Sequence, residues 1–268
     1  LAISTISKYL NGGNVLPENQ VKIQKTIDEL GFSANSFARG LKTNKSYRIG
    51  MVVESLSDQM QAGIVSRLEP ILRRHSYTTV IADCGNDIGS QSDAVDYLLA
   101  ANVDALVVIP MVDQGVADTC RQREIPVIAV LSKPDTTDVD CVLLDNYSAA
   151  YSAVRYIISF QHKKIAFIGG PENDSEAQGR YAGYTAALKN ARISIAPEYV
   201  SFGEYSSSSG YERMKMMMRQ PHPPTAALIT DFRTTFGALI AVKEMKLDIP
   251  GDLALAGFGN VELAQAMT

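Results

Sequence analysis

The sequence predicts an α/β protein in which a short helical N-terminal segment precedes doubly wound parallel sheets. Residues 1–48 carry apolar side chains at helical spacing. From Arg48 onward, short β-branched runs alternate with amphipathic helical stretches, the pattern of parallel strands covered on both faces. A chain of 268 residues with 46% hydrophobic composition can also bury a substantial core and hold more than one domain.

The N-terminal segment is predicted to form three short helices. The apolar faces of the first two are made by Ile3, Ile6 and Leu10, and by Ile23, Ile27 and Leu30. Residues 11–14 end the first helix, and Pro17 suits the first turn of the second, which Gly31 can stop. The third is expected over residues 36–42 behind an Asn35 cap, with residues 42–46 as a linker.

The remaining elements follow in alternation. The predicted strands are residues 49–53, 79–82, 105–109, 127–131, 142–144, 165–168, 226–229 and 254–256. The predicted helices are residues 64–74, 92–101, 147–160, 179–190 and 235–245.

Charge is distributed unevenly along the chain. Residues 1–48 contain seven Lys or Arg against three acidic residues, a net charge of +4, whereas the rest of the chain is −8. A basic segment on an acidic body indicates that this segment alone binds a polyanion. A basic surface that is merely solvated is the other interpretation.

Several function classes lack their signatures. Cys84, Cys120 and Cys141 have no metal-ligand spacing, and the three histidines are isolated, so we expect neither a metal site nor a catalytic cluster. Phosphate-binding glycine motifs and hydrolase motifs are absent, and the serines before Gly210 are interpreted as a polar helix start. We therefore expect no enzyme activity and no cofactor. Without a signal peptide or a run of about 18 apolar residues, a cytoplasmic protein that does not bind membranes is expected.

The segment Thr5-Ile-Ser-Lys-Tyr-Leu-Asn-Gly12 resembles the recognition-helix signature T-V-S-R-V-L-N-G of the lactose-repressor (LacI/GalR) family. Further matches follow in the family's order. They are Glu29-Leu-Gly-Phe32, Asn35, Ala38-Arg39, Leu41, Ile49-Gly50, Val103-Asp104, Ile125-Pro126, Asp145-Asn146, His162-Lys-Lys-Ile165, Gly169-Gly-Pro171, Arg180, Gly183-Tyr184, Ser209-Gly210-Tyr211, Pro224-Thr225-Ala226, Ile249-Pro250 and Gly257-Phe258. Together they cover the whole chain.

This resemblance implies a transcriptional regulator, in most members a repressor, that binds double-stranded operator DNA. It implies a DNA-binding headpiece and hinge over residues 1–46, an N-terminal lobe over 47–146 and a C-terminal lobe over 147–268. The lobes would form a core of periplasmic-binding-protein type, joined by three chain crossings, the first near residues 145–147. A small-molecule effector, a sugar or a sugar derivative, would lie between them in a homodimer or tetramer. A first helix before Leu1 and a tail after Thr268 would be missing.

The resemblance also implies DNA contacts. Ile3 and Ser4 occupy the family's specificity-setting pair, and Lys8 replaces its usual arginine. The residues expected to meet DNA are Ile3, Ser4, Thr5, Ser7, Lys8, Asn11, Asn35, Arg39 and Leu41. Residues 35–42 are too short for a stable isolated helix and are expected to order on DNA, with Leu41 wedged into the minor groove. The alternatives are that Ile3 belongs to a core and that Leu41 only packs on the headpiece.

The expected effector site departs from the family pattern. Its candidates are Ser57, Asp58, Met60, Gln61, Lys133, Arg180, Tyr205 and Asp231. Met60 and Gln61 replace the family's aromatic pair, and Gly259 stands where a carboxylate is usual. A fixed Arg180 in a site that has lost a carboxylate favours an anionic effector, such as a sugar acid or sugar phosphate. The alternative is that Arg180 pairs with a neighbouring acid in a vestigial or protein-binding pocket.

Two other classes remain as alternatives. A periplasmic-type sugar-binding protein would share the two-lobed core but would not need residues 1–45. An α/β enzyme is the third, without a supporting motif.

Overall fold

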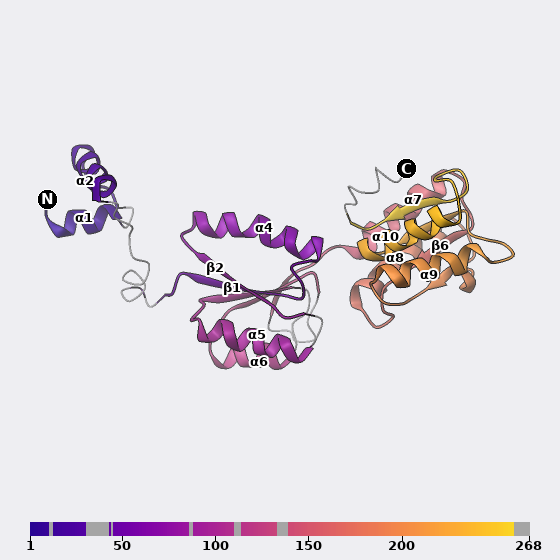
Figure 1. Ribbon diagram of the computed structural model, residues 1–268, viewed down its shortest axis with the longest axis horizontal. Coiled ribbons are helices and arrows are strands. Elements are labelled where there is room, and N and C mark those ends of the chain that lie inside the picture. The colour runs from indigo at the N-terminus through magenta and orange to yellow at the C-terminus, as the bar shows by residue number, and fades with distance from the viewer. Residues whose placement is uncertain are drawn as a thin grey trace.

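A computed structural model describes residues 1–10, 13–30, 43, 45–85, 88–109, 114–132 and 139–259. Within these residues, two helices lie at the N-terminal end and two parallel sheets follow, each with helices on both faces (Figure 1). None of the described helices is long and apolar enough to cross a membrane. The α/β parallel-sheet class predicted from the sequence is confirmed.

The N-terminal helices are α1 (Ile3–Leu10) and α2 (Pro17–Leu30). They meet over buried Val15 and Ile23, and the Tyr9 hydroxyl donates to Gln24 Oε1 at 2.8 Å. The predicted apolar face of α2 is wrong at its end, because Leu30 is 75% exposed. The predicted third helix, residues 36–42, lies outside the described residues.

The first lobe contains a five-stranded sheet in the order β2-β1-β3-β4-β5. Its strands are β1 (Arg48–Val53), β2 (Thr78–Asp83), β3 (Ala105–Ile109), β4 (Val127–Val130) and β5 (Asp140–Val142), all paired in parallel. Its helices are α4 (Gln59–Arg74) on one face, and α5 (Ile88–Ala100) and α6 (Gln114–Gln122) on the other (Figure 1).

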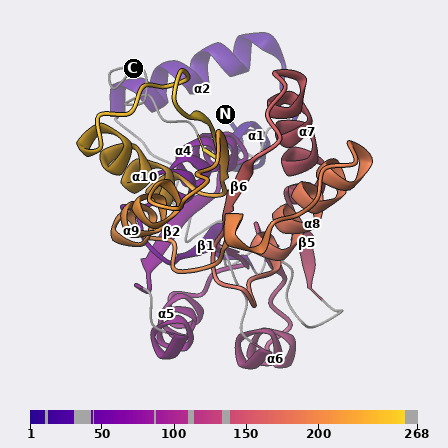
Figure 2. The ribbon, with the colours of Figure 1, turned by 90° about the vertical axis from the view of Figure 1, so that its right-hand side faces the viewer.

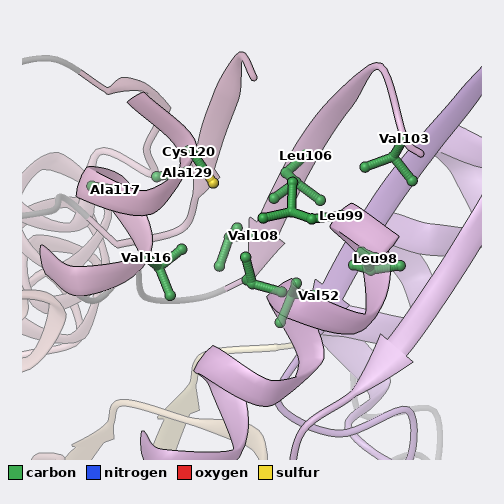
Figure 3. Packing of buried hydrophobic residues seen from close by; sticks show 11 residues of the cluster. Val52, Leu98, Leu99, Val103, Leu106, Val108, Val116, Ala117, Cys120 and Ala129 are labelled. Atoms are coloured by element: carbon green, nitrogen blue, oxygen red, sulfur yellow. The ribbon is translucent and has the colours of Figure 1, made fainter. Parts of the chain in front are cut away.

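Alternation along β1 divides the core of this lobe into two layers. Met51 and Val53 point toward the side of α4 and pack with Val65. Val52 points to the other face and joins the cluster with Leu98 of α5 and with residues of α6 (Figure 3). The near-continuous burial of β1 and β3 follows from this cover on both faces.

Asp104 holds the chain where it enters the first sheet. Its carboxylate accepts hydrogen bonds from the backbone N–H groups of Ser46 and Tyr47 at 2.7 and 2.9 Å, and from the Ser46 hydroxyl. Since Asp104 precedes β3, this contact fixes the segment before β1 against the neighbouring strand.

The second lobe contains a four-stranded parallel sheet in the order β7-β6-β8-β9. Its strands are β6 (Ile165–Ile168), β7 (Val200–Ser201), β8 (Ala226–Ile229) and β9 (Ala254–Gly257). Helices α7 (Asn146–Ser159) and α8 (Ser175–Asn190) cover one face and α9 (Ser207–Met218) and α10 (Phe232–Glu244) the other, with the short helix η1 (Pro197–Tyr199) before β7 (Figure 2). The chain passes from the first sheet to α7 through residues 143–145.

Most predicted elements are present, and the differences have local causes. The strand expected at 142–144 is β5, shifted to 140–142. The sequence did not indicate β7, which has only two residues, or the short polar helix α6. The predicted polar helix start at Ser206 is confirmed, because its side chain caps α9 by accepting from Ser209 N at 3.2 Å.

Candidate functional site

The segments that follow the carboxyl ends of strands in the two sheets contact each other. In each sheet the chain leaves the central strand first to one side and then to the other, so a crevice is expected beyond the carboxyl ends of β1 and β3 and of β6 and β8. An ion pair between Asp58 Oδ2, which follows β1, and Arg233 Nη2, which follows β8, spans 3.5 Å. We call residues 54–61, 169–180, 204–206 and 230–235 the lobe junction.

Asp58 both caps a helix and forms an ion pair with the second lobe. Its Oδ1 accepts from the backbone N–H groups of Met60 and Gln61, both at 3.0 Å, which caps the N-terminus of α4. Its Oδ2 is left to face Arg233. The side chains of Asp58 and Arg233 are 26% and 38% exposed, so this is a partly solvated contact between the lobes.

Gln61 is engaged within the loop that follows β1. It is 5% exposed, its Oε1 accepts from the backbone N–H groups of Glu54 and Ser55 at 2.8 and 3.3 Å, and its Nε2 donates to Glu54 Oε2 at 3.2 Å. These bonds occupy most of the amide's hydrogen-bonding capacity. The side chain therefore braces the loop, while Met60 beside it is 47% exposed.

Arg180 is buried and held on every side of its guanidinium. Its Nε donates to Asn146 Oδ1 at 2.9 Å, Nη1 to the Thr230 carbonyl at 2.6 Å, and Nη2 to Glu176 Oε2 at 2.9 Å. The guanidinium also lies over the ring of Phe258, 4.7 Å from its centroid. It thus ties α7, α8 and the end of β8 together.

Glu176 is the neighbouring carboxylate that the prediction of an anionic effector assumed to be absent. That expectation required a guanidinium without a carboxylate, but the Arg180 side chain is only 6% exposed and is paired with Glu176, as the alternative interpretation stated. Burial raises the pKa of Glu176, and the Arg180 charge opposes this shift. The second carboxylate oxygen, Oε1, is buried without a hydrogen-bond partner among the described residues.

Tyr205 and Asp231 stabilise the ends of helices. The Tyr205 hydroxyl donates to Asp174 Oδ2 at 2.5 Å, and Asp174 caps α8 by accepting from Ala177 N at 3.1 Å. Burial and the Asp174 contact raise the pKa of Tyr205. Asp231 caps α10 by accepting from the backbone N–H groups of Arg233 and Thr234. Both residues therefore lie at the lobe junction with some of their hydrogen-bonding groups already occupied.

Two further sequence candidates lie differently. Ser57 is exposed, and its hydroxyl is 2.7 Å from that of Ser55. Lys133 lies outside the described residues. Sequence reasoning missed Glu176 and Arg233. Glu176 could have been found from its i, i+4 spacing to Arg180, whereas nothing in the sequence relates Arg233 to Asp58.

Arg213 is a buried cation that the sequence analysis also missed. It is 7% exposed, and its guanidinium donates to the backbone carbonyls of Gly169, Ser201, Glu204 and Ser209. Burial lowers its pKa. Arg213 therefore holds the loops after β6 and β7, which carry one side of the lobe junction.

Two surface hollows lie away from the lobe junction. One, of about 330 Å³, is lined by residues such as Lys243, Lys246 and Ile249 at the end of α10. The other, of about 400 Å³, is lined by Lys189 and Ile193 beside α8. Neither includes a residue predicted to bind an effector.

The expected DNA contacts on α1 are placed on an accessible surface. Ile3 is 86% exposed, so it does not belong to a core in the described part of the chain. Ser4 and Lys8 are also exposed, whereas Thr5 and Ser7 are half-buried. The stem of Lys8 lies over Gly13, where an added Cβ would be 2.6 Å from Lys8 Cγ. Outside the described residues lie Asn11, Asn35, Arg39 and Leu41.

Comparisons with known proteins agree on one family. Residues 46–267 match the family described as periplasmic binding proteins and sugar binding domain of LacI family. The transcriptional repressor CytR of Escherichia coli is 27% identical over 99% of this chain and 78% of its own length. The transcriptional repressor PurR of Klebsiella pneumoniae is 30% identical over 99% of this chain and 79% of its own length.

Solved structures show the same fold. The lac repressor dimer bound to operator and the anti-inducer ONPF superposes with a TM-score of 0.78, at 22% identity, over 100% of this chain and 81% of that chain. The regulator CcpA of Lactococcus lactis superposes with a TM-score of 0.75, at 23% identity, over 82% of this chain and 80% of that chain. These relatives are described as transcriptional regulators and not as enzymes.

Proposed function

This chain belongs to the LacI family, and on that premise we propose that it is a DNA-binding transcriptional repressor controlled by a small-molecule effector at the lobe junction. Relatives named as transcriptional repressors align with nearly the whole chain, the segment before Arg48 included. The proposed protein acts in the cytoplasm as a homodimer or tetramer on double-stranded operator DNA, because a two-fold dimer matches a palindromic site.

The observation that carries the DNA-binding proposal is the accessible face of α1 in a basic segment. Ile3, Ser4 and Lys8 share this exposed face, and α1 is supported from behind by α2. We assign α1 as the recognition helix of a helix-turn-helix, with Ile3 and Ser4 meeting base edges and Lys8 meeting a guanine or a phosphate. Thr5, Ser7 and Asn11 would contact phosphates.

The hinge is part of the same proposal. Residues 35–42, with Asn35, Arg39 and Leu41, would form a helix only on DNA, where Leu41 enters the minor groove. The Asp104 contacts to Ser46 and Tyr47 would pass a movement of the first lobe to this hinge. We expect Leu41→Ala to weaken operator binding without lowering the melting temperature of the free protein, and equal losses in both would contradict this role.

Selection from a random duplex pool tests the proposal directly. The full chain should enrich one palindromic sequence, with an affinity that falls as salt rises. Deleting residues 1–45 should abolish binding and leave the circular dichroism of the core unchanged. A periplasmic-type binding protein would enrich no sequence, since this class gives α1 and α2 no DNA to contact.

Single substitutions refine the test. Lys8→Ala should lower the salt slope by about one if Lys8 meets a phosphate, or relax base preference at one position if it meets a base. Lys189→Ala removes the same charge from the exposed end of α8 and should change neither. Equal effects of the two substitutions would refute a specific contact by Lys8.

A further inference from the structure

Three buried oxygens at the lobe junction have no hydrogen-bond partner among the described residues. They are Glu176 Oε1, Thr230 Oγ1 and Thr234 Oγ1. Thr230 and Thr234 are 0% and 1% exposed, and the Thr230 carbonyl accepts from Arg180, which holds Glu176 on its other side. Leaving a buried polar atom without a partner costs free energy, so an unpaired carboxylate oxygen such as Glu176 Oε1 is a candidate acceptor for a hydrogen bond from another molecule.

The charged side chains of the lobe junction disfavour the binding of an anion, because its arginines are paired with carboxylates. Both arginines that border the lobe junction are paired, Arg180 with Glu176 at 2.9 Å and Arg233 with Asp58 at 3.5 Å. Arg213 directs its guanidinium to backbone carbonyls behind the loops. Three more carboxylates stand at the strand ends with hydrogen bonds to donors, and these are Glu54, Asp174 and Asp231.

A ligand group at Glu176 Oε1 must therefore bring a hydrogen. A carboxylate oxygen only accepts hydrogen bonds, so a hydroxyl or amino group is complementary to it, while a phosphate or carboxylate would face like charge at close range.

Resting on the effector site proposed above, we propose that Glu176 restricts this site to neutral or cationic effectors with hydroxyl or amino donors. Glu176 neutralises Arg180 and offers Oε1 as an acceptor. Anionic sugars and free phosphate are excluded, because the guanidinium that would bind them is already occupied by Glu176.

Calorimetric titration of the full chain without DNA tests this selectivity. The probes are glucose, glucosamine, gluconate, glucose 6-phosphate and inorganic phosphate. We expect any binding of an anionic probe by the wild type to be too weak to detect. We expect Glu176→Gln to bind at least one anion about tenfold or more tighter than that detection limit, equivalent to about 1.4 kcal/mol. Adding Arg180→Gln to that variant should remove the gained binding.

A matched control separates a local effect from a change in overall charge. Glu212→Gln removes an exposed carboxylate from α9, outside the lobe junction, and should bind anions as the wild type does. Circular dichroism verifies folding, and Glu176→Ser replaces Glu176→Gln if the latter does not fold. Wild-type binding of an anion that Arg180→Gln abolishes overturns the proposal, and so does a folded Glu176 variant that gains none. Because no DNA is present, either failure leaves the DNA-binding proposal standing.

Discussion

Arg180→Met removes a buried cation and leaves its partners behind. The substitution keeps an unbranched apolar stem over Phe258 but deletes the three donors to Asn146, Thr230 and Glu176. Glu176 then retains a buried carboxylate with no guanidinium beside it. The expected result is a large loss of stability in the second lobe.

The magnitude follows from the burial of the pair. The side chains of Arg180 and Glu176 are 6% and 19% exposed, so solvent screens their interaction weakly. Breaking a buried ion pair from one side costs about 3–5 kcal/mol, since an uncompensated charge remains. For a chain of this size, such a loss corresponds to roughly 10 °C in melting temperature. Removing both charges costs less, so Arg180→Met with Glu176→Leu should recover at least ~2 kcal/mol of the single-variant loss.

Urea unfolding provides the assay. Far-UV circular dichroism and tyrosine fluorescence follow the transition, because the chain has 12 tyrosines and no tryptophan. Arg155→Met, at an exposed position on α7, is the control and should change stability by less than ~0.5 kcal/mol. A loss below about 1 kcal/mol for Arg180→Met, or a double variant as unstable as the sum of its parts, would refute the assignment of a buried pair.

Three further predictions concern pH, salt and helix packing. Burial raises the pKa of Glu176 in the folded state, so protonation of this carboxyl favours folding below its unfolded pKa, and this contribution is lost as pH rises through the folded pKa. Unfolding measured at several pH values should therefore show the wild type gaining stability over Glu176→Gln as pH falls into the acidic range. A stability difference that stays constant with pH would contradict this. Arg233→Glu places two carboxylates side by side at Asp58, and the lost ion pair should cost no more than the ~1 kcal/mol of an exposed pair. The repulsion should increase the radius of gyration measured by X-ray scattering at low salt but not at high salt, where it is screened. A change that does not depend on salt would point to another cause. Gly237→Ala should destabilise the second lobe by about 1–3 kcal/mol, because the added Cβ would lie 1.8 Å from a backbone carbonyl oxygen of α9. The control Gly63→Ala, whose Cβ would have no atom within 4 Å, should stabilise the protein by up to ~1 kcal/mol. Equal melting temperatures for the two variants would disprove the close approach at Gly237.

The helices and strands were predictable because their signals are local. The buried run of β1, the apolar periodicity of α10 and the polar start of α9 at Ser206 depend on residues within about one turn or one strand. One error arose where the local signal was weak, because the two residues of β7 show no period. The other arose where the local signal did not match the packing, because Leu30 continues the apolar spacing of α2 but remains exposed.

The sequence predicted residues that lie at the lobe junction, but it did not predict their contacts. Asp58, Arg180, Tyr205 and Asp231, which the family resemblance proposes for the effector site, all lie there, and their binding of an effector stays a prediction. The sequence analysis expected these side chains to be available to a ligand, whereas in the structure hydrogen bonds to neighbouring groups already occupy much of the hydrogen-bonding capacity of each one. The position of Glu176 four residues before Arg180 allowed a pair, but exposed pairs at this spacing contribute only a few tenths of a kcal/mol.

The sequence alone therefore determined the class of the fold, the family and the segments that carry the basic and acidic charge, since these depend on composition, periodicity and order along the chain. The tertiary structure decided the electrostatics of the lobe junction. Arg180 and the Thr230 carbonyl are 50 positions apart and meet only because α8 packs beside the end of β8. Whether the Arg180 charge is free for a ligand depends on burial and on which carboxylate lies within hydrogen-bonding distance, and both arise only when the sheets and helices have packed.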